Sequence, residues 1–111
     1  MLFTGDASAD SIEQILKHIP QKISVLKVPH HGAFGGINKR IITALNPEYS
    51  IISVGENRFG HPSRYTLHLL KNTKILRTDI HNSIKIKANN KKYQIFTYNP
   101  AKQKYEKVNN N

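Results

Sequence analysis

The sequence of 111 residues contains no cysteine. Disulfide bridges and thiolate zinc sites are therefore excluded, and a metal ion would have to be held by histidine, aspartate or glutamate. No apolar run approaches the roughly 20 residues that a membrane-spanning helix needs. The N-terminus also lacks the basic segment followed by an apolar segment that is typical of a signal peptide. We therefore expect a soluble chain, and its length fits one small domain.

Acidic residues are few, because 7 aspartates and glutamates stand against 17 lysines and arginines, for a formal net charge of +10. The excess is concentrated between Lys71 and Lys107, where ten basic residues accompany only Asp79 and Glu106. Such a field attracts polyanions, nucleic acid first and anionic membrane second. A solvated lysine-rich surface without a specific partner explains the pattern equally well, because the arginines do not cluster.

The apolar residues predict alternating helices and strands. Asp10 as N-cap and Glu13 form a candidate capping box for a helix that ends at Pro20. Helical spacing of apolar residues continues this helix and predicts a second one before Asn46-Pro47 (Ile12, Ile15, Leu16, Ile19; Ile37, Ile41, Ile42, Leu45). Buried strands are predicted where the sequence is rich in aliphatic residues, at 23–28 and 49–54, with a further helix from Pro62 and a short strand at 75–78.

The C-terminal part has a different pattern. Residues 84–88 alternate between apolar residues and lysine, Asn89-Asn90 predicts a turn, and 93–98 predicts the second strand of an antiparallel hairpin with one side in water. From Pro100 the sequence is polar and rich in lysine and asparagine. We therefore expect a folded part at 1–99 and a flexible basic tail at 100–111.

Polar residues follow each strand of the predicted order β-α-β-α-β-α-β, which implies a parallel sheet. They are Asp6, His30 with His31, His61 and Asp79. Because the carboxyl ends of parallel strands share one edge, where ligands bind in open α/β sheets, these residues predict one site. A carboxylate with two imidazoles suits Zn²⁺, or Mn²⁺ where oxygen ligands predominate, and a bound metal makes hydroxide available near pH 7.

Each of these residues also has a simpler interpretation. An aspartate after a strand is often a turn or helix-cap residue. For His30 and His31, the simpler interpretation is one core histidine bonded to the backbone and one solvated histidine. His18 and His68, within helices, and His81, in a turn, are assigned to surface or packing roles.

Five motifs occur in the order FTGD (3–6), LKVPHHG (26–32), IISVG (51–55), NRFGHP (57–62) and RTD (77–79). Together they resemble the C-terminal half of the metallo-β-lactamase-like domain of the ComEC competence family, whose members belong to membrane-embedded bacterial DNA-uptake channels. The resemblance implies an α/β fold, half of an αββα sandwich, mostly parallel and followed by the antiparallel hairpin. It also implies a bacterial chain, cytoplasmic if expressed alone and membrane-associated in the parent family.

The activity implied by the resemblance is metal-dependent hydrolysis of the DNA strand that is not imported. Asp6 resembles a carboxylate that bridges two metals, and His30 and His61 resemble metal ligands. His31 is then a catalytic group facing the phosphate, and Asp79 orients a ligand. Asn57 and Arg58 would line the substrate cleft, and Lys85 and Lys87 on the basic face are expected to bind the substrate.

The family's first half, with its histidine- and aspartate-rich metal motif, has no counterpart here. We therefore expect an uncovered apolar face on the parallel sheet, and a homodimer or docking onto an N-terminal half. The leading hypothesis is a partial DNA hydrolase that needs completion. The alternatives are a non-catalytic module that binds nucleic acid through its basic face, and a hydrolase of small phosphates or esters.

Overall fold

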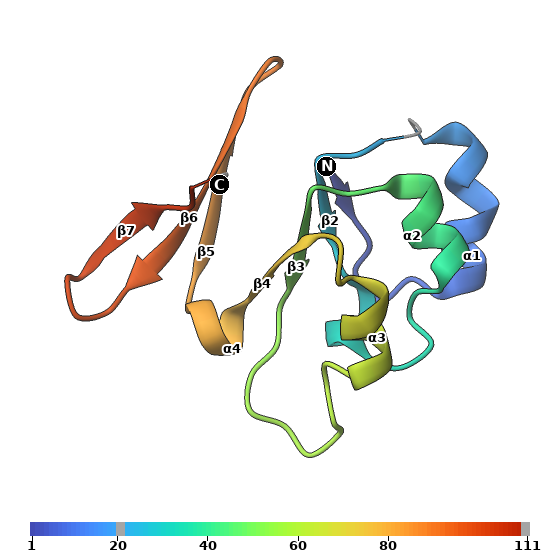
Figure 1. Cartoon of the computed structure of the whole chain (residues 1–111), viewed down its shortest axis with the longest axis horizontal. Helices are drawn as coiled ribbons and strands as arrows, with labels where there is room; N and C mark the ends of the chain where they lie inside the picture. Colours follow the sequence, from blue (N-terminus) through green and yellow to red (C-terminus); the bar gives the residue numbers. More distant parts are fainter. Residues whose placement is uncertain (20–21, 110–111) are drawn as a thin grey trace.

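The computed structural model describes residues 1–19 and 22–109. It contains two β-sheets, and helices cover the outer side of the first one (Figure 1). The first sheet has four parallel strands in the order β1-β2-β3-β4, namely β1 (Leu2–Phe3), β2 (Val25–Lys27), β3 (Tyr49–Ile52) and β4 (Lys74–Arg77). The predicted parallel α/β arrangement is thereby confirmed. Strands β2 and β3 are shorter than the apolar segments that predicted them, although Ile23, Val28 and Val54 remain buried.

Short helical segments connect the parallel strands. They are α1 (Ala9–Ile15), η1 (Leu16–His18), η2 (Pro29–Gly32), α2 (Lys39–Leu45) and α3 (Arg64–Leu69), while α4 (Thr78–His81) leads from β4 into the second sheet. The N-caps of α1, α2 and α3 are Ser8, Asn38 and Ser63, each accepting a hydrogen bond from the backbone N–H three residues later. These side chains satisfy a backbone donor that the first helical turn leaves free.

The predicted capping box of Asp10 and Glu13 is wrong. The helix begins at Ala9, because the Ser8 hydroxyl accepts from the Ser11 N–H at 3.2 Å, and Asp10 lies within the first turn. Its regular α-helical part ends at Ile15 and continues as a 3₁₀ turn to His18. The predicted stop at Pro20 lies outside the described residues. The second helix ends as predicted, because Asn46 before Pro47 takes up a left-handed conformation with φ 42°.

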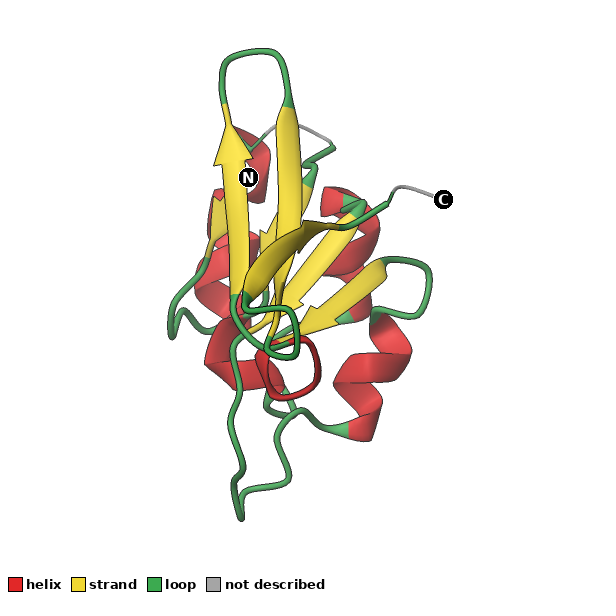
Figure 2. Cartoon of the chain, turned by 90° about the vertical axis from the view of Figure 1, so that its left-hand side faces the viewer, coloured by secondary structure: helices red, strands yellow, loops and turns green. Residues whose placement is uncertain are grey.

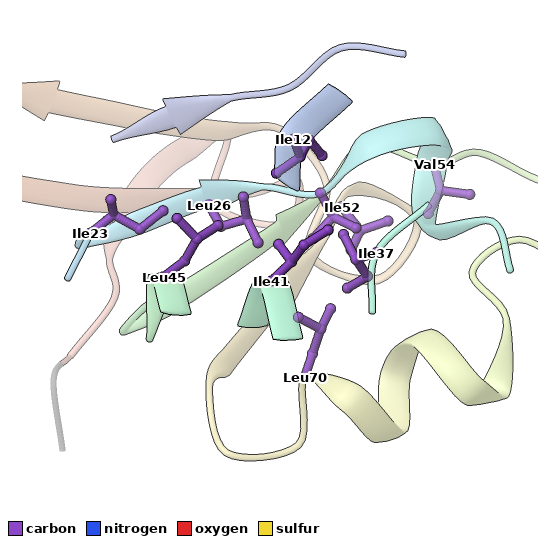
Figure 3. Close-up of a cluster of buried hydrophobic side chains, with 10 residues drawn as sticks. Ile12, Ile23, Leu26, Ile37, Ile41, Leu45, Ile52, Val54 and Leu70 are labelled. Atoms are coloured by element: carbon purple, nitrogen blue, oxygen red, sulfur yellow. The ribbon is translucent and has the colours of Figure 1, made fainter. Parts of the chain in front are cut away.

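One face of the parallel sheet packs against the helices (Figure 3). Leu26 and Ile52 point from the central strands toward Ile12 of α1 and Ile41 of α2, and all four are at most 1% exposed. Full burial of each such side chain stabilises the fold by about 2 kcal/mol. This cluster fixes the strand ends relative to the helices, and so it positions the loops that follow the strands.

The second sheet is antiparallel, with order β5-β6-β7: β5 (Ile84–Ala88), β6 (Tyr93–Asn99) and β7 (Lys104–Lys107). The predicted hairpin is confirmed. The structure differs from the expected flexible tail, because Lys104–Lys107 forms a strand along β6. The lysine-rich composition concealed this strand, whose Tyr105 ring packs edge-on against Tyr98 with centroids 5.3 Å apart.

The antiparallel sheet covers the second face of the parallel sheet. Figure 2 shows the two sheets as adjacent layers, with the helices behind them. Tyr49, Ile51 and Leu76 pack with Ile95 of β6 in a second buried cluster. The expectation that this face lies uncovered is therefore wrong for β2, β3 and β4, because the chain supplies its own covering layer. The edge strand β1 differs, since Phe3 is 70% exposed. Association into a homodimer stays a prediction.

Candidate functional site

Three loops converge at the carboxyl edge of the parallel sheet. The His30 N–H donates a hydrogen bond to the Gly5 carbonyl at 3.2 Å, which joins the loops after β1 and β2. The Ser63 N–H donates to the Gly32 carbonyl at 2.9 Å, which joins the loop after β2 to the start of α3. The sequence prediction that these loops meet at one edge is confirmed for this part of the site.

The segment His30-His31-Gly32 has an unusual backbone. All three residues are left-handed, with φ of 51°, 56° and 79°. This conformation costs a non-glycine residue roughly 1–2 kcal/mol. Such strain persists only where the surroundings impose it, and it occurs preferentially at functional sites. Gly32 is required by a close approach as well, because a Cβ there would lie 2.6 Å from Cβ of Pro62.

Asp6 and His30 form the charged pair at this edge. The distance between Asp6 Oδ1 and His30 Nδ1 is 3.8 Å, and their side chains are 81% and 41% exposed. That separation is long for a direct hydrogen bond. It suits an ion pair, or two ligand atoms that both contact one ion or water molecule between them. Both groups are open to solvent, so a phosphate, a water molecule or a metal ion can reach them.

His31 is held by the backbone of the neighbouring strand end. Its ring Nδ1 lies 2.7 Å from the Ser53 carbonyl oxygen. Because a carbonyl only accepts, Nδ1 carries the hydrogen, and in the neutral ring Nε2 is left with a free lone pair. Neither member of the pair is a core histidine, since His30 is only half-buried and His31 is exposed. Fixing one ring nitrogen in this way is how proteins orient imidazoles that bind metals or transfer protons.

His61 lies in a loop organised by Asn57. The Asn57 amide nitrogen donates to the carbonyls of Gly55 and His61 at 3.0 and 2.9 Å, and its oxygen accepts from the N–H groups of Phe59 and His61, both at 3.0 Å. The His61 ring stacks on the 81% exposed Phe59 ring, with centroids 5.6 Å apart. Asn57 was predicted to line the substrate cleft, and the structure uses its whole amide group to shape the loop. Arg58 is exposed in the same loop.

Lys27 belongs to this edge and was missed by the sequence interpretation. It lies on β2 beside Phe3 of β1, and its ammonium is 3.5 Å from the Val28 carbonyl. Burial lowers its pKa, while the nearby Asp6 carboxylate opposes this shift. The sequence did contain a signal, because Lys27 stands between two aliphatic residues of a predicted buried strand, Leu26 and Val28. Lysine is rarely buried unless its charge is paired, so a lysine at such a position indicates a specific interaction.

Asp79 is engaged by its own neighbour. Its carboxylate accepts two hydrogen bonds from the Arg77 guanidinium, at 3.0 and 2.7 Å. These bonds lower the pKa of Asp79 below its usual value. The adjacent Thr78 hydroxyl connects this loop to β3 through the Val54 backbone, at 2.8 Å on both the N–H and the carbonyl. The predicted role of Asp79 in orienting a ligand therefore stays a prediction, because its carboxylate is paired with Arg77.

Metal-ligating side chains are sparse in the described part of the chain. Across residues 1–19 and 22–109, no three histidine, aspartate or glutamate side chains form a group able to hold a metal ion. Asp6 and His30 lie close together, but His61 does not join them in a group of three ligands within the described residues. The described residues of the chain therefore do not complete a metal site on their own.

Lys85 and Lys87 lie elsewhere, on the antiparallel sheet. Their ammonium groups stand over aromatic rings, Lys85 at 4.1 Å from the Tyr105 centroid and Lys87 at 5.6 Å from that of Phe96. The sequence grouped them with the edge residues as substrate-binding, but the structure gives them a separate surface.

The chain is similar to parts of two much longer bacterial proteins. It is 34% identical over 103 residues to ComE operon protein 3 of Bacillus subtilis (strain 168), an alignment that covers 89% of this chain and 13% of that protein. It is 40% identical over 55 residues to Recombination protein 2 of Haemophilus influenzae, which covers 50% of this chain and 7% of that protein. No protein-family model matches the chain, and no solved structure matches it significantly.

None of the helices in the described part of the chain has both the length and the apolar character required to cross a membrane.

Proposed function

We propose that the chain is part of a DNA-uptake protein of the ComEC competence type, and that it forms the C-terminal half of a metallo-β-lactamase-like hydrolase domain. The observation that carries the proposal is the meeting of Asp6 and His30, from separate motifs, at the carboxyl edge of a parallel sheet. The similarity to ComE operon protein 3, which extends over 89% of the chain, supports the competence part of this proposal.

In this proposal Asp6 and His30 are two donors of a Zn²⁺ or Mn²⁺ site, and the remaining donors come from outside the described residues. A bound metal would supply hydroxide at neutral pH. The chain's own groups would then bind and position the DNA. Lys27 and Arg58 attract the phosphate. His31, with its Nδ1 on the Ser53 carbonyl, offers the Nε2 lone pair to a proton, and the protonated Nε2–H can then donate to a phosphate oxygen.

The test is a chimera in which this chain replaces the matched region of ComE operon protein 3. We expect the chimera to support uptake of DNA and to bind Mn²⁺ in calorimetry, and Asp6→Ala or His30→Ala to abolish both. Asp10→Ala removes a carboxylate from α1 and serves as the matched control. Metal binding and uptake that survive Asp6→Ala would refute the hydrolase assignment.

The charge distribution favours a second function, a non-catalytic module that binds nucleic acid. Of the residues in β5, β6 and β7, only Glu106 is acidic. Binding through lysines releases counterions from the phosphates, so it should weaken with salt and survive removal of metal. We expect combined glutamine substitution of Lys85, Lys87, Lys91 and Lys92 to abolish it and to leave any metal site intact.

A further inference from the structure

We infer that the outer face of the antiparallel sheet is a stacking platform for single-stranded nucleic acid. The inference rests on the proposed handling of DNA, and it adds a defined surface and a class of ligand. We call this surface the lysine–aromatic face. Its residues are Lys85, Lys87, Phe96, Tyr98, Tyr105 and Lys107.

The strand register defines this face. Lys85 is paired with Phe96, which is paired in turn with Lys107, so these three side chains point to the same side of the sheet. Tyr98 and Tyr105 are likewise opposite one another. The intervening residues have the opposite orientation, and Ile95 packs against the parallel sheet. Figure 2 views the molecule from the side of the antiparallel sheet, and no other described element lies in front of it.

Rings and cations alternate on the lysine–aromatic face. The Lys85 ammonium is 4.1 Å from the Tyr105 ring centroid and 5.4 Å from that of Phe96. Tyr98 and Tyr105 pack edge-on, and the Tyr105 ring is 38% exposed. A lysine over a ring is a weak contact at an exposed site, about 0.5–1 kcal/mol. An arriving base can therefore take its place on the ring, while the ammonium moves to the neighbouring phosphate.

A basic groove adjoins this face at Lys87 and Lys107 and extends toward the inner side of the sheet, where Tyr93 and Ile95 line it. It has a volume of about 650 Å³, and four lysines, Lys87, Lys91, Lys92 and Lys107, contribute to its lining. Glu48 also lines it, but its carboxylate accepts a hydrogen bond from the Tyr93 hydroxyl and lies 3.9 Å from the Lys74 ammonium. Glu106 is bound by Lys102 at 3.2 Å. The net field over the face and the groove is therefore positive, which suits a phosphate backbone.

The chemistry favours a single strand over other polyanions. Unpaired bases expose the flat faces that stack on aromatic rings, whereas a duplex buries them. Membrane insertion is disfavoured, because Phe96 and Tyr98 are half-buried and do not form the exposed apolar face that enters a bilayer interface.

The experiment is fluorescence anisotropy with a labelled 12-residue oligothymidylate, an abasic strand of the same charge and a 12-base-pair duplex. We expect the oligothymidylate to bind about tenfold more tightly than the abasic strand, because stacking contributes 1–3 kcal/mol per base. Tyr105→Leu keeps an apolar side chain but removes the ring, and it should remove this preference. Tyr65→Leu changes another exposed tyrosine, on α3, and should preserve it.

The lysines are tested by salt dependence. The double variant Lys85→Gln with Lys87→Gln should show a weaker salt dependence. The magnitude of the negative slope of log K against log salt should fall by about 1.4, since each phosphate contact on a single strand contributes about 0.7. Lys17→Gln with Lys39→Gln, on the helical side, should leave the slope unchanged. Circular dichroism verifies that each variant is folded, and Tyr105→Phe, which keeps a ring, should retain the preference.

Equal affinity for the thymidylate and abasic strands would overturn the platform. So would an unchanged preference in folded Tyr105→Leu, or binding to phosphatidylserine vesicles in place of any oligonucleotide. If the platform fails in these ways while the chimera with ComE operon protein 3 takes up DNA in an Asp6-dependent manner, the proposed function stands without it. Loss of uptake in Asp6→Ala is independent of Tyr105, so the two failures are distinguishable.

Discussion

The carboxyl edge of the parallel sheet and the outer face of the antiparallel sheet are built by different means. At the edge, Asp6, His30 and His61 lie in loops far apart in the sequence, and left-handed backbone at His30, His31 and Gly32 sets the directions of the two adjacent histidine side chains. On the antiparallel sheet, alternation along regular strands places lysines and rings on one side. The edge can therefore be altered by one backbone change, whereas the face depends on individual side chains.

The largest expected losses of unfolding free energy come from shortening side chains in the two buried clusters, and they show whether each region depends on its own cluster. Leu26→Ala, in the cluster under the helices, should cost about 4 kcal/mol of unfolding free energy, and Ile95→Ala, between the sheets, about 3 kcal/mol. Leu26 is fully buried and Ile95 is 3% exposed beside a smaller cluster. Urea denaturation measures both values. A negligible loss for Ile95→Ala would show that the antiparallel sheet is not held by this contact.

The strained edge is tested with two glycines. Gly32→Ala should cost about 3 kcal/mol, because alanine is strained at φ 79° and its Cβ would meet Pro62. Gly35→Ala should cost only about 1 kcal/mol, since Gly35 has φ 84° but nothing within 4 Å of the added Cβ. Urea midpoints of the two variants give the comparison. Equal losses would mean that the approach of Pro62 does not constrain the loop.

Two asparagines compare loop organisation in the two regions. Asn57→Ala removes four hydrogen bonds around His61 and should cost about 1 kcal/mol, with faster amide exchange at Phe59 and His61. Asn89→Ala removes two bonds, to the N–H groups of Lys91 and Lys92, and should cost roughly half as much. Hydrogen exchange followed by NMR measures both. Unchanged protection at His61 would contradict the role given to Asn57.

The smallest effect concerns acid stability. Hydrogen bonds from Arg77 hold the pKa of Asp79 below its ordinary value of 3.8. The folded state thus binds this proton less readily than the unfolded state, so the contribution is present above the unfolded pKa and is lost as the pH falls through the folded pKa. Asp79→Asn should be less stable at neutral pH and should converge with the wild type in acid.

Glu106→Gln is the counterpart on the antiparallel sheet. Hydrogen bonding from Lys102 and Asn99 lowers the pKa of Glu106, so the sign is the same. The effect should be smaller, because the Glu106 side chain is 40% exposed and that of Asp79 is 24% exposed. Thermal melts between pH 7 and pH 2 compare the two variants with the wild type. Parallel curves for Asp79→Asn would show that its bond with Arg77 contributes nothing to folding.

Sequence patterns were sufficient for the order of strands and helices. Periodicity predicted α2 and the hairpin, and the near-continuous apolar sequence at 49–54 predicted a strand buried on both faces, as β3 is. Sequence patterns were not sufficient where two residues could fill the same local role, or where long-range pairing decided the structure. Ser8 took the capping role given to Asp10, and β7 formed in a segment whose composition suggested none, because pairing with β6 satisfies its backbone.

The sequence by itself determined the alternation of elements, the absence of thiolate chemistry and the concentration of positive charge after Lys71. Only the tertiary structure decided that the second sheet covers the first, that Asp6 meets His30 while Asp79 is held by Arg77, and that Lys85 and Lys87 lie over aromatic rings. The physical reason is that spacing along a chain encodes local periodicity. Contacts between loops depend on how strands that are distant in the sequence pack, which spacing along the chain does not encode.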